Sequence, residues 1–240
     1  VGIGMAMYRR YWVRNHRLWD RHTSSEDDIF IWTLFGLGVG AGVMAGSQVS
    51  AEQMDRLFGH GQDPVTGRKL GRGFHHPPSY ADRVAARIKA LPERMSQRAR
   101  AKAIEKIRAE EHVRRVRRPV VGFDYVVTVP KSVSSLWAVA DHGIREQITA
   151  AHYDAIADII ELIERDIART RVGTDGVAQV PVNGIVAAAF DHYDSREHDP
   201  NLHTHVVIAN RVQAADGKWR TLDSRGVIFP SVVALSETYD

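Results

Sequence analysis

Residues 202–213 read LHTHVVIANRVQ, a run of β-branched and apolar side chains that predicts a β-strand. A second run of this kind, GIVAAAFDH, covers residues 184–192, and the polar residues 193–201 between the two predict a loop. Strands that follow each other through a short loop tend to pair antiparallel, so the two runs predict a β-hairpin. Asp216-Gly217 then predicts a tight turn into a further strand at residues 218–222.

Upstream of this hairpin the sequence alternates between strand and helix patterns. Apolar, β-branched residues predict a strand at 120–129, and residues 131–137 follow Pro130 as the beginning of a helix. Apolar side chains then recur at helical spacing through residues 144–170, and a strand is predicted at 177–182. These patterns favour the α+β class, with an antiparallel central sheet flanked by helices.

The composition limits the classes of protein to which the chain can belong. Its 240 residues are 44% hydrophobic and 25% charged, which is enough for one large domain or two small ones with a buried core. The absence of cysteine excludes a disulfide-bonded scaffold, thiolate nucleophiles, iron–sulfur clusters and cysteine-ligated zinc. A catalytic metal would be held by His, Asp or Glu, and the chain contains 12 His.

Positive charge is concentrated in one part of the chain. The formal net charge is only +3, but residues 68–118 contain 16 Lys and Arg against five Asp and Glu. Two helices, at residues 79–91 and 93–112, are predicted to carry most of these cations as a helical insertion. The block favours a polyanionic partner such as nucleic acid, and a solvated helical surface is an equal alternative.

The N-terminal segment, residues 1–48, is treated separately from residues 49–240 because its pattern is hard to assign. Residues 1–28 show neither helical nor strand periodicity. Residues 29–46 carry no charge, which would suit a membrane span, but their five glycines favour a loop. A near match to a dinucleotide-binding fingerprint in this segment lacks the βαβ pattern that such a site needs.

His203 and His205 are the strongest candidates for chemistry. They alternate with Thr204 on the predicted strand, so both imidazoles lie on one face, with Cα atoms about 6.5–7 Å apart. His192 ends the preceding strand, from which an antiparallel partner would present it to the same point. Three neutral imidazoles leave coordination positions open, as is typical of a catalytic metal site. The alternative is that these histidines only form hydrogen bonds.

Asp124 stands within the apolar run GFDYVVTVP at residues 122–130. A buried carboxylate is costly unless it is paired, so a buried Asp124 would need a partner such as a His N–H or a tyrosine hydroxyl. An edge strand with Asp124 facing water fits the sequence equally well.

These motifs together resemble the relaxase domain of MobF-type conjugative relaxases, which belong to the HUH endonuclease superfamily, particularly those of actinobacterial plasmids and integrative elements. The resemblance covers residues 49–240 and rests on the segments GFD at 122–124, VPKSVS at 129–134, FDH at 190–192, DPNLHTHVVIAN at 199–210 and GKWRTLD at 217–223. It implies a relaxase domain with a basic helical part at 68–118 and a catalytic sheet at 120–240, truncated at its C-terminal end.

The resemblance also implies an activity and its residues. Such relaxases nick one DNA strand at an origin of transfer through a 5′-phosphotyrosine intermediate and rejoin it. A tyrosine near the N-terminus, here Tyr11 or Tyr8, would be the nucleophile, and a divalent metal would be held by His192, His203 and His205. Asp124 would orient a ligand histidine or help to activate the tyrosine.

Cofactor and partners follow from the same resemblance. The metal would be Mg or Mn, with Zn, Ni or Co as alternatives. Single-stranded DNA would be the substrate, and its phosphates would be contacted by Lys131, Arg114, Arg115, Arg117 and Arg118. A C-terminal helicase module and the conjugation machinery would be further partners, the location would be the bacterial cytoplasm, and no membrane span is expected.

Two other functions remain open at this stage. The sequence around Tyr8 and Tyr11 departs from the family pattern, so both could be ordinary packing aromatics. The chain would then be a relaxase-like module that binds single-stranded DNA without cleaving it. A cupin-like metalloenzyme would need a ligand Glu soon after His205, and residues 206–210 contain none.

Overall fold

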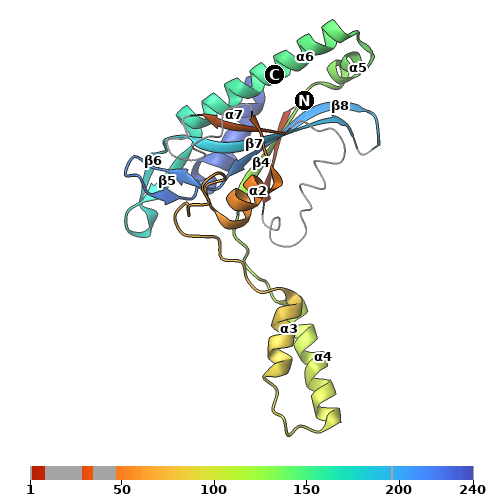
Figure 1. The fold of residues 1–240 in the computed structure, drawn as a ribbon, viewed down its shortest axis with the longest axis vertical. Coiled ribbons are helices and arrows are strands. Elements are labelled where there is room, and N and C mark those ends of the chain that lie inside the picture. The colour runs from red at the N-terminus through yellow and green to blue at the C-terminus, as the bar shows by residue number, and fades with distance from the viewer. Residues whose placement is uncertain (1, 9–28, 35–46, 196, 240) are drawn as a thin grey trace. The chain divides into compact units, whose positions relative to one another are not determined.

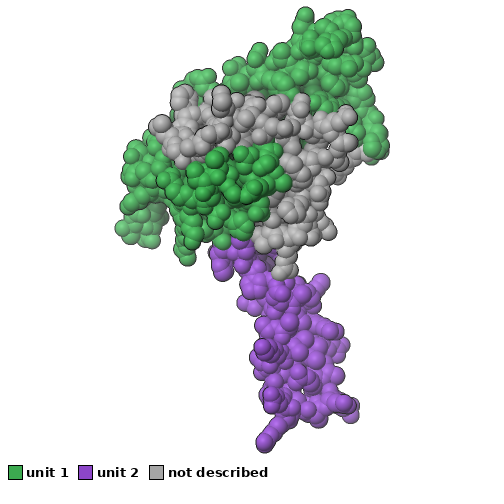
Figure 2. All heavy atoms as spheres, viewed as in Figure 1, with its two compact units in different colours: residues 1–74, 120–240 green, residues 75–119 purple. Residues whose placement is uncertain are grey.

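The computed structural model describes residues 2–8, 29–34, 47–195 and 197–239 (Figure 1). The chain divides into two compact units (Figure 2). The first unit combines residues 1–74 with residues 120–240, and the second is residues 75–119. Each unit is described separately below.

A six-stranded sheet forms the centre of the first unit, and all its pairings are antiparallel. The strand order is β1 (Gly2–Tyr8), β4 (Gly122–Thr128), β8 (Pro200–Ala209), β7 (Ile185–Asp194), β2 (Ile29–Leu34) and β3 (Ser47–Gln48). The predicted α+β class with an antiparallel central sheet is confirmed.

One face of the sheet packs against the long helix α6 (His142–Leu162) and against α7 (Phe229–Tyr239) (Figure 1). Phe123 and Val127 of β4 and Ile156 of α6 are buried in this core. Burial of each such side chain contributes about 1.5–3 kcal/mol. This core packs the middle strands against the helices. The side chains that alternate with the core residues along these strands therefore lie on the opposite face of the sheet.

The other face of the sheet is partly covered by α2 (Ala51–Met54) and the π-helical turn Asp55–Gly59 that follows it. Ser50 caps this helix in a complete capping box with Gln53. Phe58 packs so closely on Gly122 that a Cβ at this glycine would lie 2.9 Å from the Phe58 ring. Gly122 therefore permits the close approach of the helical turn to β4.

Two short ribbons flank the sheet, and both correct predicted boundaries. β9 (Val212–Gln213) pairs with β10 (Trp219–Arg220) around the predicted Asp-Gly turn, with Gly217 at φ +73°. The predicted strand at 202–213 is divided at Asn210, because its side chain binds the Val120 carbonyl and the Leu222 N–H.

The second ribbon pairs β5 (Arg169–Val172) with β6 (Ala178–Pro181), across a 3-10 turn at Thr174–Gly176. The prediction of a helix through residue 170 is therefore wrong at its end. α6 passes into a π-helical turn at Ile163–Ile167, in which Glu164 accepts a hydrogen bond from the Ile185 N–H of β7. A contact with so distant a residue gives no signal in the local helical pattern.

Two predictions for the N-terminal segment are corrected as well. Residues 2–8 form β1, where no strand was predicted, and residues 29–34 form β2 in place of the predicted loop. β2 pairs with β7 on one side and β3 on the other, so pairing partners rather than an alternating pattern specify it. Among the described residues, no helix is long and apolar enough to span a membrane.

The second unit is a helical hairpin of α3 (Tyr80–Lys89) and α4 (Gln97–Val113). α4 begins four residues later than predicted, because Ser96 caps it through a hydrogen bond from the Ala99 N–H. Glu111 of α4 is buried and pairs with three arginines, Arg83, Arg87 and Arg114. The hydrogen bond from Arg83 is the main cause that lowers the pKa of Glu111 to about 2.

Candidate metal centre and active site

His192, His203 and His205 converge at one point on the sheet face opposite the α6 core. Their ring centroids are 5.0–5.3 Å apart, and one nitrogen of each lies within 4.8 Å of the others. This is the arrangement in which three imidazoles can bind a single cation. It matches the cluster that the sequence predicts.

The strand register explains why these three side chains meet. His203 and His205 are two residues apart on β8 and lie on the same face. His192 of β7 is directly opposite His203 in the antiparallel pair. A β-bulge between His192 and Asp194 follows at once, so the regular pairing ends where the cluster lies.

The hydrogen bonds of two of the histidines orient their rings. Nδ1 of His205 lies 2.9 Å from Oδ2 and 3.0 Å from Oδ1 of Asp124. Nδ1 of His203 lies 2.7 Å from the carbonyl oxygen of Asn201. The carboxylate and the carbonyl group each accept a hydrogen bond from an Nδ1–H, so the lone pair of each neutral ring is on Nε2, which is the nitrogen a metal would use.

Asp124 is buried at 5% exposure, and β4 lies between β1 and β8. The alternative of a water-facing Asp124 on an edge strand is therefore wrong. Its carboxylate belongs to the histidine cluster.

Burial favours the neutral form of His203. His203 is 9% exposed, and desolvation is the main cause that lowers its pKa, partly opposed by the hydrogen bond with Asn201. A ligand imidazole must be deprotonated, so this shift favours metal binding at neutral pH.

Helix α5 (Lys131–Val139) supports the strand end that carries the cluster. Ser134 accepts a hydrogen bond from the Leu202 N–H at 3.1 Å, and Trp137 stacks on Tyr193 with ring centroids 5.2 Å apart. Lys131 pairs with the Asp199 carboxylate and donates to the Pro200 carbonyl. The segment VPKSVS thus binds β8 and the loop before it, and Trp137 adds a contact with β7.

The chain as a whole matches a known protein family. The profile of the TrwC relaxase family matches residues 10–240. The chain belongs to the TrwC relaxase family. The resemblance to MobF-type conjugative relaxases that the motifs indicated is thereby confirmed.

Relatives of this relaxase chain include the multifunctional conjugation protein TraI of Escherichia coli, which is 41% identical over 104 residues. The aligned part is 43% of this chain and 6% of TraI. The protein of the same name from Escherichia coli strain K12 is 39% identical over 104 residues, again 43% of this chain and 6% of TraI. The chain thus corresponds to about 6% of the length of these relatives.

Solved structures of conjugative relaxase TrwC share the fold of this relaxase chain. The metal-bound TrwC complex with oriT DNA has a TM-score of 0.65 at 21% identity, and covers 99% of this chain and 66% of that chain. The metal-free complex with oriT DNA has the same TM-score and identity, and covers 65% of that chain. At this identity the likeness establishes the fold.

The two tyrosines considered as nucleophiles lie at or beyond the limit of what the structure describes. Tyr11 lies outside the described residues. The backbone of Tyr8 ends β1 opposite Gly122, four residues beyond the row that joins Gly4, Val126 and His205. The choice between them therefore stays a prediction.

The basic residues considered for DNA binding differ in how free they are. Lys131 is engaged by Asp199, and Arg114 by Glu111. Arg115, Arg117 and Arg118 are exposed in the segment that follows α4, and none of them forms an ion pair with a described residue.

Several residues around the cluster were missed in the sequence. Asn201 and Ser134 act through a backbone carbonyl and a hydroxyl, which have no pattern of their own. Asp191 and Thr204 are different, because both are polar residues next to the cluster histidines, on the alternate face of strands that are otherwise apolar. That alternation was visible in the sequence and could have identified them.

Proposed function

We propose that this chain is the DNA-nicking domain of a conjugative relaxase, a metal-dependent transesterase acting on one strand at an origin of transfer. The observation that carries the proposal is the convergence of His192, His203 and His205, with Asp124 orienting His205, in a member of the TrwC relaxase family. A cluster of three buried or half-buried imidazoles with oriented rings suits electrostatic catalysis at a phosphodiester.

The proposed reaction transfers a phosphoryl group to the protein. The tyrosine oxygen forms a bond to phosphorus, and the bond between phosphorus and the 3′ oxygen breaks. The proton lost by the tyrosine is balanced by the proton gained at the free 3′-OH. The ester bond is conserved as a 5′-phosphotyrosine, so the reverse step rejoins the strand without an external energy source.

We assign His192, His203 and His205 as ligands of a divalent metal. The donor set fits, because the Nε2 lone pairs of His203 and His205 are set by their Nδ1 hydrogen bonds. A bound cation would stabilise the negative charge that develops on the phosphate oxygens. We propose Mg or Mn as the ion, with Zn, Ni or Co as alternatives that imidazole ligands favour.

The nucleophile is proposed to be Tyr11, with Tyr8 as the second candidate. Both lie in the N-terminal part of the chain, where the resemblance to relaxases places the attacking tyrosine. A tyrosine has an ordinary pKa near 10, so attack at neutral pH needs a base or a cation near its oxygen.

DNA is proposed to bind in a salt-dependent manner through the basic segment after α4. Arg115, Arg117 and Arg118 would contact phosphates, while Lys131 and Arg114 would contribute through their charge, because both are already paired. TrwC is described as bound to oriT DNA in its solved complexes, which supports DNA as the partner. A helicase module and the conjugation machinery are proposed further partners of the whole protein, in the bacterial cytoplasm.

The experiment is a covalent-adduct assay on the purified chain. Labelled single-stranded oligonucleotides tiling the origin of transfer of the source element are incubated with Mn²⁺ or with EDTA and then denatured. We expect an EDTA-sensitive protein–DNA adduct that is lost in Tyr11→Phe and in His203→Ala. DNA binding without an adduct in the unchanged chain would instead identify a non-cleaving binding module.

A further inference from the structure

A buried polar network lies on the back of the β7–β8 hairpin, on the sheet face opposite the three histidines. Asp191 of β7 and Thr204 of β8 are direct partners in the antiparallel register. The Thr204 hydroxyl donates to Oδ1 of Asp191 at 2.6 Å, and the two residues are 0% and 1% exposed. Asp191 precedes His192, and Thr204 lies between the other two ligands.

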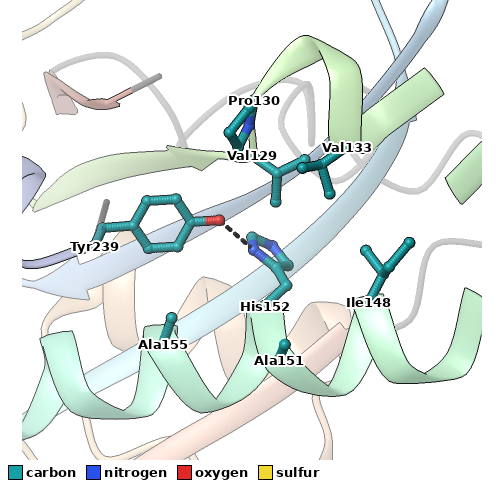
Figure 3. Close-up of a pocket in the computed structure, with 8 residues that line it drawn as sticks. All are labelled: Val129, Pro130, Val133, Ile148, Ala151, His152, Ala155 and Tyr239. Atoms are coloured by element: carbon teal, nitrogen blue, oxygen red, sulfur yellow. Dashed lines mark hydrogen bonds between the residues drawn. The ribbon is translucent and has the colours of Figure 1, made fainter. Parts of the chain in front are cut away.

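Helices α6 and α7 complete this network. Tyr153 donates to Oδ2 of Asp191, and Nε2 of His152 lies 2.9 Å from the Thr204 hydroxyl oxygen. Nδ1 of His152 lies 2.7 Å from the Tyr239 hydroxyl, and Figure 3 shows the two side chains pointing toward one another. The buried carboxylate is thus satisfied by two hydroxyl groups, which offsets the cost of its burial.

The directions of these hydrogen bonds form one consistent chain. The Thr204 hydroxyl donates a hydrogen bond to Asp191, so its oxygen accepts a hydrogen bond from Nε2–H of His152. Nδ1 of His152 is then an acceptor, and Tyr239 donates to it. This requires a neutral His152, and the pocket of about 410 Å³ beside it is lined mainly by apolar side chains such as Val133 (Figure 3).

The position of the network matters because of the bulge. The last regular β7–β8 pair is His192–His203, and the Asp191–Thr204 pair lies one row before it. A register slip of one residue moves every side chain of a strand to the other face, and pairing is least constrained where the ladder is interrupted. A side-chain hydrogen bond in the row next to the last regular pair opposes such a slip.

We propose that the Asp191–Thr204 pair, braced by Tyr153 and His152, is a positioning element that holds His192 opposite His203 and so sets the metal affinity of the three-histidine site. The inference rests on the proposed function in one respect, that the three histidines bind a divalent cation. None of the four network residues is a proposed ligand of the cation. Asp191 and Thr204 would act through the strand backbone, and Tyr153 and His152 through these two side chains.

The test compares Mn²⁺ affinity in three variants of the chain, measured by titration with Mn²⁺ alone. Thr204→Val keeps the β-branched shape but removes the hydroxyl that joins Asp191 to His152. Thr204→Ser restores the hydroxyl and is the rescue variant. Ile208→Val, in the core on the same strand and face, is the control for a general loss of stability.

We expect Thr204→Val to weaken Mn²⁺ binding about tenfold, as for other changes behind metal ligands. Thr204→Ser and Ile208→Val should bind Mn²⁺ as the unchanged chain does. Should Thr204→Val fail to fold, Tyr153→Phe removes one donor to Asp191 from a half-buried position and should weaken Mn²⁺ binding in the same direction.

Two results would overturn the inference, and they differ in what they say of the proposed function. If Thr204→Val loses thermal stability but binds Mn²⁺ like the unchanged chain, the network is purely structural and the metal site stands. If the unchanged chain does not bind Mn²⁺ or any other divalent ion, both the metal assignment and this inference fail.

Discussion

Asp124 of β4 accepts a hydrogen bond from Nδ1 of His205 of β8 at 2.9 Å, although the residue directly opposite Asp124 is Val207. The contact is a diagonal one across neighbouring strands, which brings a carboxylate and an imidazole together on one sheet face. It fixes the orientation of the His205 ring, so that Nε2 faces the cluster. The carboxylate would therefore act on a bound metal through the histidine.

The first prediction concerns this carboxylate. Asp124→Asn keeps the side-chain shape and an accepting oxygen but removes the negative charge. We expect the affinity for Mn²⁺ to fall by about 10- to 100-fold, as is typical when the partner of a ligand histidine is changed. Titration with Mn²⁺ measures this. Asp158→Asn on the exposed side of α6 is the matched control, and equal affinities in the two variants would contradict the role of Asp124.

The second prediction concerns metal addition and removal. A ligand that binds only the folded chain stabilises it, by about 2.7 kcal/mol at a concentration of one hundred times its dissociation constant. We expect Mn²⁺ to raise the melting temperature, and EDTA to reverse the rise. His203→Ala should abolish the effect, whereas His198→Ala, an exposed histidine in the β7–β8 loop, should retain it. A rise of equal size in both variants would place the bound ion elsewhere.

Local sequence patterns were sufficient for the elements that carry the cluster. The β7–β8 hairpin, the shared face of His203 and His205 and the Asp216-Gly217 turn all follow from period-two alternation and turn chemistry. Asp124 was identified as a charge in an apolar strand, but only the structure decides between its two interpretations. β4 lies between two other strands and the Asp124 side chain is buried, so the paired interpretation of this carboxylate is correct.

Elements that depend on distant partners were not predictable in this way. β1 has no distinctive pattern and becomes a strand by pairing with β4. β2 is different, because its sequence IFIWTL is rich in β-branched and aromatic residues, and it was missed when the whole glycine-containing stretch 29–46 was assigned to a loop. The end of α6 depends on Glu164 binding the Ile185 N–H, 21 residues away in sequence. The contact of His152 with Tyr239 spans 87 residues. Such contacts arise from packing in three dimensions, which a window of neighbouring residues does not report.

The third prediction concerns the pH dependence of stability through Glu164. Burial raises the pKa of this carboxyl from 4.5 to about 7, so the folded chain holds a proton that the unfolded chain releases between these values. Stability from this group is complete below about pH 4.5 and is lost as pH rises through 7. We expect the free energy of unfolding of Glu164→Gln, relative to that of the unchanged chain, to increase by up to about 3 kcal/mol as the pH rises from 5 to 8.

Chemical unfolding at pH 5 and at pH 8 tests this prediction. The comparison between two pH values cancels the constant cost of placing an amide beside Ile185. Glu237→Gln, at an exposed position of α7, is the control and should show no such dependence on pH. A Glu164→Gln effect of the same size at both pH values would mean that Glu164 titrates as in the unfolded chain.

The fourth prediction separates the exposed cations from those used within the helical hairpin. Arg83, Arg87 and Arg114 surround Glu111, so only part of the positive charge of residues 68–118 is available to a polyanion. Replacing Arg115, Arg117 and Arg118 together by Gln should reduce the slope of log affinity against log salt by about 0.7 for each lost contact with single-stranded DNA.

Binding of a labelled oligonucleotide at several salt concentrations measures that slope. The control replaces Arg94, Arg98 and Lys102 by Gln, which removes the same charge from exposed positions in the turn before α4 and in its first two turns. A reduced slope in the first variant alone would assign the phosphate contacts to the segment after α4. Equal reductions would indicate that the whole unit acts through its net charge. Unchanged slopes in both variants would mean that these arginines are an ordinary solvated surface, because a cation that releases no counterion contributes nothing to the salt dependence.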